Sequence, residues 1–328
     1  MPKVLITTVP FGQIDRYPLD LLEQNNISYL INPLGKKLTE SEQIDLVGDC
    51  EVIVAGTEEI SEKVILAAKN LKLISRVGIG LDSVDLIAAR KNGVSVSYTP
   101  DAPAPAVADL TMGLIYTLLR NAHIANMQMH QGNWKRYFGR RLTECSIGII
   151  GAGRVGSKVI HNLKFLGCKS ILYHDANVRL DIEDNDQIKF TTKDNIYRKC
   201  DVISLHVPLD SKTKNMITLK EMEIMKSDSL LVNTARGGII NERDLEIALR
   251  DNIIGAAAMD VFEIEPYSGS LGKYDNCLLT SHMGSMTTDC RTRMEIEATE
   301  EAVRYILHSE QQQPVPEAEY LIRTETES

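Results

Sequence analysis

The sequence has no apolar run of the roughly 18 residues that a membrane span needs, no Cys-x-x-Cys pair and no excess of positive charge. Its opening, MPKVLITTV, lacks the length and cleavage site of a signal peptide. The net charge of −9, from 36 basic and 45 acidic residues, argues against binding to nucleic acid or a membrane surface, because such surfaces are basic. Six scattered cysteines favour neither a zinc site nor disulfides. We therefore expect no metal, reduced thiols and a cytoplasmic location.

The 328 residues are 43% hydrophobic and 25% charged, which is typical of a globular chain of about two domains. Short apolar runs alternate with helical stretches, which predicts an α/β fold with doubly wound parallel sheets. The expected strands are 3–9, 27–31, 51–54, 71–77, 94–97, 145–150, 170–173, 202–205, 229–233, 254–258 and 277–280. The expected helices include 19–24, 41–47, 61–69, 83–91, 106–129, 157–166 and 287–308.

Three prolines in the seven residues 99–105 predict a linker between the two α/β series, because proline removes a backbone donor and restricts its predecessor. The helix 106–129 that follows is nearly apolar all round at its start, which is typical of a helix buried in a core or an interface. Trp134, the only tryptophan, is interpreted as an interface or core anchor. The polar tail 311–328 is expected to be loosely ordered.

A G-x-G-x-x-G pattern is the strongest local signal in the chain. The apolar strand 146–150 leads into Gly151, Gly153 and Gly156, and a helix follows. In this context the first glycine permits a tight turn, the second lets a pyrophosphate approach the backbone, and the third lets the helix pack closely. The helix N-terminus then supplies free N–H groups for phosphates. The alternative is a glycine turn of any α/β protein.

The next strand ends at Asp175, 19 residues after Gly156. A carboxylate at this position accepts hydrogen bonds from the adenosine ribose and repels a 2′-phosphate, which favours NAD over NADP. Arg179 lies four residues further on and leaves some use of NADP open.

Three later strands are each followed by a side chain suited to acid–base chemistry on a hydroxy acid. They are Arg236, a natural clamp for a carboxylate, Glu265, and His282 in a turn of small residues. Ligand sites of open α/β sheets form outside the carboxyl ends of the strands, so these loops are expected to converge. Each has a plain alternative, since a lone histidine or a turn arginine is more often structural, and Glu263 competes with Glu265.

Six sequence blocks resemble the D-isomer-specific 2-hydroxyacid dehydrogenase family, with most similarity to its phosphoglycerate dehydrogenase branch. They are RVGIGLDSVD (76–85), the glycine pattern, HVPL (206–209), NTARGG (233–238), and DVF through EP (260–266) with SHMGS (281–285). The resemblance implies an NAD-binding Rossmann domain over 101–285 and a flavodoxin-like substrate domain over 1–100 and 286–328. It also implies a homodimer built on the long helix after residue 103.

The resemblance assigns a role to each matching residue. Arg236 binds the carboxylate and 2-oxygen of a 2-hydroxy or 2-oxo acid, His282 is the general acid and base, and Glu265 is its partner. The backbone of Val77 and Gly78 holds the carboxylate. The NAD site is implied to include Gly151, Gly153, Arg154, Val155, Gly156, Asp175, Val207, Thr234, Asp260 and Gly284.

The choice of substrate stays open at this point. Ala55 stands where phosphoglycerate dehydrogenases tend to carry arginine, which weakens phosphoglycerate as a substrate, and no C-terminal regulatory domain is expected. Four basic residues offer an anion contact, or merely a solvated face or subunit contact: Lys135, Arg136, Arg140 and Arg141. Glu265 argues against formate dehydrogenase, which has glutamine there. Phosphite dehydrogenases and NAD-sensing corepressor scaffolds remain alternatives.

Overall fold

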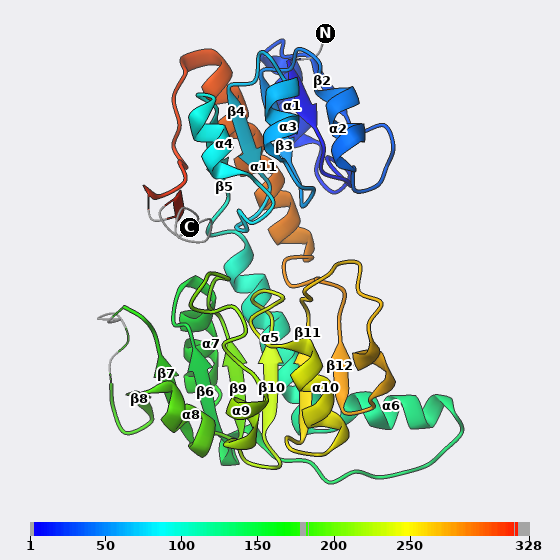
Figure 1. Ribbon diagram of the computed structural model, residues 1–328, viewed down its shortest axis with the longest axis vertical. Coiled ribbons are helices and arrows are strands. Elements are labelled where there is room, and N and C mark those ends of the chain that lie inside the picture. Colours follow the sequence, from blue (N-terminus) through cyan, green and yellow to red (C-terminus); the bar gives the residue numbers. More distant parts are fainter. Residues whose placement is uncertain (1–2, 178–181, 183, 318, 321–328) are drawn as a thin grey trace. The chain divides into compact units, whose positions relative to one another are not determined.

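The computed structural model describes residues 3–177, 182, 184–317 and 319–320, and Figure 1 shows its ribbon. The chain divides into two compact units. Unit 1 comprises Met1–Pro103 and Met286–Ser328, and unit 2 comprises Ala104–Ser285. Each is a parallel α/β sheet with helices against it, so the predicted fold class is confirmed.

Unit 1 contains a five-stranded parallel sheet in the order β2-β1-β3-β4-β5 (Figure 1). The inner strands β1, β3 and β4 are nearly inaccessible to solvent, as expected for a parallel sheet with both faces covered, whereas the edge strand β2 is half-buried. The strands are β1 Val4–Ile6, β2 Tyr29–Ile31, β3 Val52–Ala55, β4 Leu73–Arg76 and β5 Ser95–Tyr98. The helices are α1 Tyr17–Gln24, α2 Glu40–Val47, α3 Glu62–Ala67, α4 Leu86–Lys91 and α11 Thr288–His308.

Helix α11 belongs to unit 1 although it follows unit 2 in sequence. Its buried face carries Met294, Ala298 and Ala302 at a spacing of four residues, the apolar stripe of an amphipathic helix. Ser75 Oγ in β4 donates to the Ala298 carbonyl at 2.8 Å. The Gly12 N–H donates to the buried Glu295 carboxylate at 2.9 Å. The helix is therefore a part of the unit 1 core.

The expectation of a loosely ordered tail is wrong for its described part, residues 311–317 and 319–320. Val315 and Tyr320 are 8% and 9% exposed and join the apolar core of unit 1. Pro314 forms a β-bridge with Ser97, and Arg90 makes a bidentate ion pair with Glu317 at 2.8 and 2.6 Å. Two apolar anchors are thus enough to hold a segment of mostly polar composition.

Unit 2 contains a seven-stranded parallel sheet in the order β12-β11-β10-β9-β6-β7-β8 (Figure 1). The short strand β8 was not expected from the sequence. The strands are β6 Ser146–Ile150, β7 Ser170–His174, β8 Ile188–Phe190, β9 Val202–Leu205, β10 Leu230–Asn233, β11 Ala256–Met259 and β12 Cys277–Leu279. The helices are α5 Pro103–Leu119, α6 Ala122–His130, α7 Arg154–Phe165, α8 Lys193–Lys199, α9 Leu219–Glu223 and α10 Glu242–Arg250, with short 3₁₀ turns at Leu142–Glu144 and Ser270–Lys273.

The single helix expected over 106–129 is two helices. The first of them, α5, begins earlier than expected, at Pro103. Proline is tolerated at the start of a helix because the first N–H groups of a helix have no partner within it. The proline segment 99–105 is thus partly the first turn of α5. The break falls at Asn121, whose φ of 51° is left-handed, a conformation that asparagine tolerates better than most residues. The apolar face of α5 is buried in the core of unit 2, whereas α6 has no buried residue.

All six cysteines are free and buried. Burial raises the pKa of the Cys50 and Cys200 thiols to about 12, so these groups are poor nucleophiles. No helix in the described part of the chain is both long and apolar enough to span a bilayer. Within the same residues, no group of three or more His, Cys, Asp or Glu side chains is placed to hold a metal ion.

Candidate active site and nucleotide-binding loop

The glycine loop joins β6 to α7 and has the geometry of a phosphate-binding turn. Gly151 has φ +93°, which disfavours any other residue. A Cβ on Gly156 would lie 1.9 Å from the Gly151 carbonyl oxygen, so only glycine permits this close packing. No atom lies within 4 Å of a Cβ built on Gly153, which leaves open space above the backbone there. These features fit the pyrophosphate of a dinucleotide.

The helix of this motif begins earlier than the sequence suggested. Helix α7 starts at Arg154, with Gly153 as its N-cap, instead of at residue 157. Gly156 therefore lies in the first turn of the helix, and Arg154 and Val155 occupy the positions whose N–H groups point toward a bound anion.

Asp175 follows β7 and holds the glycine loop. Its Oδ2 accepts the Ala152 N–H at 2.7 Å, and its Oδ1 accepts the Asn177 N–H at 2.9 Å. The predicted contact with the adenosine ribose is an additional role that stays a prediction. Arg179, the base that left NADP open, lies outside the described residues.

His206, directly after β9, lies beneath the same loop. A Cβ on Gly151 would meet the His206 carbonyl oxygen at 2.5 Å, and one on Gly156 would approach the His206 Cβ at 3.4 Å. The ring Nε2 is 2.9 Å from Ser204 Oγ, and Nδ1 is buried. Burial lowers the pKa of His206 to about 3, so the ring is neutral and acts as a packing element. Apart from the HVPL block, no sequence pattern indicated this role.

The loop that carries Arg236 follows β10 and is shaped by Asn233. The Asn233 side chain accepts the Ala235 N–H at 3.0 Å and donates to the Arg236 carbonyl at 2.8 Å. Gly237 is required because a Cβ there would lie 1.9 Å from the Phe262 carbonyl oxygen. The Arg236 loop thus packs directly against the loop that follows β11. Neither Asn233 nor Gly237 was predicted to shape the site, although both stand in the NTARGG block.

His282 and Glu265 form a direct pair. His282 Nδ1 lies 2.7 Å from Glu265 Oε2, and Glu265 Oε1 accepts the Phe262 N–H at 3.1 Å. Both side chains remain accessible, at 44% and 32% exposure. Glu263, the competing carboxylate, does not take this position. Since the carboxylate accepts the hydrogen bond from Nδ1–H, Nε2 is the nitrogen left for a substrate.

Asp260, buried to 1% exposure, builds the turn that presents His282. Its carboxylate accepts the N–H of Met283 at 2.9 Å, the N–H of Gly284 at 3.0 Å and the hydroxyl of Thr280 at 2.5 Å. The His282 N–H donates to the Asp260 carbonyl at 2.8 Å, and His282 itself has a left-handed φ of 50°. The Asp260 carboxylate is therefore committed to the turn. Its predicted role in the NAD site is untested.

The remaining predicted residues lie in both units. In unit 2, Val207 follows β9 and is half-buried, and Thr234 follows β10 with its hydroxyl 2.8 Å from Thr111 Oγ1. In unit 1, Val77 and Gly78 follow β4. Their N–H groups already donate to the Ala55 carbonyl at 2.8 Å and to Thr99 Oγ1 at 2.8 Å. The predicted carboxylate contact would have to displace these bonds or use a neighbouring amide.

Two of the four basic residues before β6 are paired with acids of unit 2. Arg140 pairs with Asp228 at 3.2 Å, and Arg141 pairs with Glu144 at 2.7 Å. Trp134 is 79% exposed and is therefore not a core anchor in this chain.

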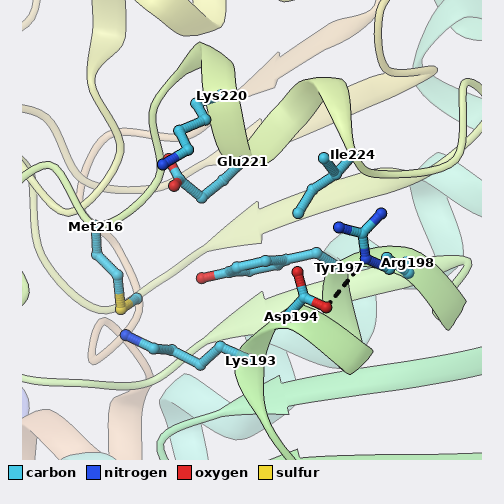
Figure 2. Close-up of a pocket in the computed structure, with 8 residues that line it drawn as sticks. All are labelled: Lys193, Asp194, Tyr197, Arg198, Met216, Lys220, Glu221 and Ile224. Atoms are coloured by element: carbon cyan, nitrogen blue, oxygen red, sulfur yellow. Dashed lines mark hydrogen bonds and ion pairs between the residues drawn. The ribbon is translucent and has the colours of Figure 1, made fainter.

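A separate groove of about 380 Å³ lies between α8 and α9. Figure 2 shows the Tyr197 ring at its centre, with Met216 and the lysines Lys193 and Lys220 around it. None of the predicted site residues lines this groove, so the strand-end loops remain the candidate active site.

The chain was then compared with known proteins. Residues 112–284 match the sequence model of the D-isomer specific 2-hydroxyacid dehydrogenase NAD-binding domain. The chain is 34% identical over 273 residues to a hydroxypyruvate reductase of Thermotoga maritima, covering 81% of this chain and 88% of that one. This chain belongs to the D-isomer specific 2-hydroxyacid dehydrogenases. It is an NAD-dependent dehydrogenase that acts on CH–OH groups.

Two further relatives of this dehydrogenase carry other names. A D-3-phosphoglycerate dehydrogenase of Methanocaldococcus jannaschii is 36% identical over 260 residues, which are 77% of this chain and 49% of that one. The chain thus spans about half the length of that relative. The solved structure of a glyoxylate reductase from Paecilomyes thermophila has a TM-score of 0.84 and 27% identity, covering 97% of this chain and 100% of that chain. The three names differ in substrate.

Proposed function

We propose that this dehydrogenase interconverts a small D-2-hydroxy acid and its 2-oxo acid. The observation that carries the proposal is the pair of His282 Nδ1 and Glu265 Oε2 at 2.7 Å. The loop of Arg236 packs against the loop of Glu265 through Gly237. The proton-transfer group follows β12 and the carboxylate-binding cation follows β10, on either side of β11, whose loop carries Glu265.

Each residue of the three has a role that follows from its chemistry. Arg236 binds the substrate carboxylate with a planar, bidentate guanidinium and stabilises charge that develops on the 2-oxygen. His282 takes the hydroxyl proton at Nε2 in the oxidative direction and returns it in the reductive direction. Glu265 fixes the tautomer of His282 and stabilises its protonated form. NAD, when bound, supplies the hydride acceptor or donor.

The geometry of unit 2 supports the proposed cofactor residues. The open space at Gly153 and the N–H groups at the start of α7 are suited to the pyrophosphate. Asp175 is suited to the ribose, and Val207, Thr234 and Gly284 stand in the loops after β9, β10 and β12. We assign unit 2 as the NAD-binding domain and unit 1 as the substrate domain.

The proposal is tested by following NADH absorbance with purified protein against glyoxylate, pyruvate, hydroxypyruvate, phosphohydroxypyruvate and 2-oxoglutarate. We expect turnover of at least one small 2-oxo acid. We expect His282→Ala and Arg236→Ala each to lower turnover by about 100-fold or more with the fold intact. Near-normal turnover in either variant would contradict the assignment. A protein that binds NADH and reduces none of these acids would favour a sensor or scaffold instead.

A homodimer and a cytoplasmic location belong to the same proposal. Helix α6 has no buried residue, and the segment that follows it exposes Trp134 and Phe138 at 79% and 102%. Exposed aromatic side chains of this kind are typical of a subunit interface. Light scattering of the wild type and of Trp134→Ser tests the dimer, and the six free thiols support a reducing compartment.

A further inference from the structure

The segment 263–266, which carries Glu265, has little apolar packing of its own. Each of its four residues is exposed, and Ile264 among them is 78% exposed. The segment is bounded by Phe262 and Tyr267, whose rings stack with their centroids 4.1 Å apart. Apolar packing therefore anchors only the two ends of the segment, and the backbone between them depends on polar contacts for a fixed position.

One such contact comes from helix α10. Glu242, the first residue of that helix, accepts the Glu263 N–H at its Oε1 over a distance of 2.6 Å. Gly237 lies against the same peptide unit, because a Cβ on it would be 1.9 Å from the Phe262 carbonyl oxygen and 2.6 Å from the Glu263 nitrogen. The Phe262–Glu263 peptide is thus held both by the loop of Arg236 and by the start of α10.

Glu242 itself stands on a well-packed element. Helix α10 is amphipathic and buries Leu245 and Leu249. The Asn241 side chain caps the helix by accepting the Asp244 N–H at 3.1 Å, and the Glu242 side chain is half-buried. A side chain on a packed and capped helix is a more precise support for a site than a side chain on a loop.

The Glu242 carboxyl group lies near the two acids of the segment that it holds. Burial and the charges of Glu263 and Glu265 raise the pKa of Glu242 above its ordinary value, while the bond from the Glu263 N–H acts in the opposite direction. A carboxyl group offers an acceptor oxygen in either protonation state. The contact with the Glu263 N–H therefore does not require the charged form of Glu242.

We propose that Glu242 is a positioning residue that keeps Glu265 in contact with His282. It acts by holding the Phe262–Glu263 peptide, from which the exposed segment 263–266 begins. The inference rests on the proposed function, in which His282 transfers the hydroxyl proton and Glu265 fixes its tautomer. Without the contact the segment is free to shift, and a shift of about 1 Å at a catalytic group costs up to about 100-fold in rate. The plain structural alternative is that Glu242 only stabilises the start of α10.

Four variants separate the contact from the stability of the helix. Glu242→Ala removes the acceptor. Glu242→Asp keeps an acid in the first turn of α10 but is one methylene too short to reach the Glu263 N–H, so it serves as the test if Glu242→Ala unfolds. Glu242→Gln keeps an acceptor oxygen at the original length. The matched control, Glu62→Ala, removes a glutamate from the first position of helix α3 in unit 1.

Turnover is measured by NADH absorbance with the best 2-oxo acid of the panel. We expect Glu242→Ala and Glu242→Asp to lower kcat at least about tenfold, and Glu242→Gln to keep it within about threefold of wild type. We expect Glu62→Ala to change kcat less than about twofold, because a residue at an exposed helix start far from the site contributes only to stability. The KM for NADH is expected to stay within about twofold in all four variants, since the glycine loop is untouched.

A double-mutant cycle shows whether Glu242 acts through Glu265. We expect the kcat of the double variant Glu242→Ala, Glu265→Ala to equal that of Glu265→Ala within about twofold, because no carboxylate remains to be positioned. A merely structural role makes the two losses multiply. The inference is overturned if they multiply, or if Glu242→Ala and Glu242→Asp both keep kcat within about twofold of wild type while wild type is active; the proposed function then still stands.

Amide hydrogen exchange tests the contact without any turnover. We expect the Glu263 amide to exchange at least about tenfold faster in Glu242→Ala and Glu242→Asp than in wild type and Glu242→Gln. If wild type reduces no 2-oxo acid, the proposed reaction fails, and the exchange rates alone decide whether Glu242 holds this segment. An unchanged exchange rate at Glu263 overturns the inference whether or not the protein is active.

Discussion

Replacing Asp260 by asparagine perturbs the turn that presents His282 while keeping the side-chain size. The carboxylate now accepts three hydrogen bonds at 1% exposure. Asparagine has only one acceptor oxygen. If that oxygen keeps Thr280 and Met283, the new NH₂ group faces the Gly284 N–H at about the 3.0 Å of the present bond. Two donors then oppose each other in a buried position.

The cost follows from this loss. A hydrogen bond to a charged acceptor contributes about 1.5–3 kcal/mol, and a buried unsatisfied donor costs a similar amount. We expect a destabilisation of about 3 kcal/mol and a fall in Tm of about 5–10 °C for a domain of this size. If this destabilisation displaces His282 in the active enzyme, we expect kcat/KM to decrease by up to about 100-fold, because each 1.4 kcal/mol of lost transition-state stabilisation lowers the rate about tenfold.

The assay is NADH absorbance for kcat/KM together with thermal unfolding followed by circular dichroism. Asp45→Asn, at an exposed position of α2, is the matched control and should leave both quantities unchanged. The reasoning is refuted if Asp260→Asn keeps kcat/KM within about twofold of wild type and melts at the same temperature.

Three further predictions concern the nucleotide loop. Gly156→Ala would place a Cβ 1.9 Å from the Gly151 carbonyl oxygen; we expect a fall in Tm of at least about 5 °C and weakened NADH binding by fluorescence titration, and unchanged binding would contradict the close packing. Asp175→Ala removes the acceptor of the Ala152 N–H; we expect a KM for NADH raised at least about tenfold and a smaller preference over NADPH, and an unaltered preference would argue against the ribose role. His206 has a folded pKa of about 3, below the unfolded value of about 6.5, so the unfolded chain binds more protons between these values and stability falls as pH drops through that window. In urea denaturation, we expect the free energy of unfolding of His206→Gln to fall less than that of wild type between about pH 6 and 4. If the two proteins lose stability equally over this range, the protonation of His206 is not a source of the pH dependence.

The features that could be predicted from the sequence are those fixed by local chemistry. The glycine spacing identifies the nucleotide loop because each glycine there meets a steric demand within a few residues. Arg236, Glu265 and His282 stand out because each follows an apolar strand, and parallel strands bring their carboxyl ends to one edge. The contact between His282 and Glu265 confirms that these loops converge.

What could not be predicted depends on partners far along the chain. The role of Asp260 in shaping the His282 turn was not predicted, because its three donors lie 20–24 residues later and no local pattern reveals them. The break at Asn121 depends on a single left-handed residue inside an apolar stretch. The ordered tail depends on two apolar side chains, Val315 and Tyr320, within a polar composition.

The position of α11 has a consequence for synthesis on the ribosome. Strands β1 to β5 emerge first, but the helix that covers β4 through the Ser75–Ala298 bond follows only after all of unit 2 has been made. Unit 2 is one continuous segment and has every strand of its sheet available before α11 appears. The nascent chain can therefore complete its second unit before its first, and the first sheet keeps an uncovered apolar face until α11 emerges.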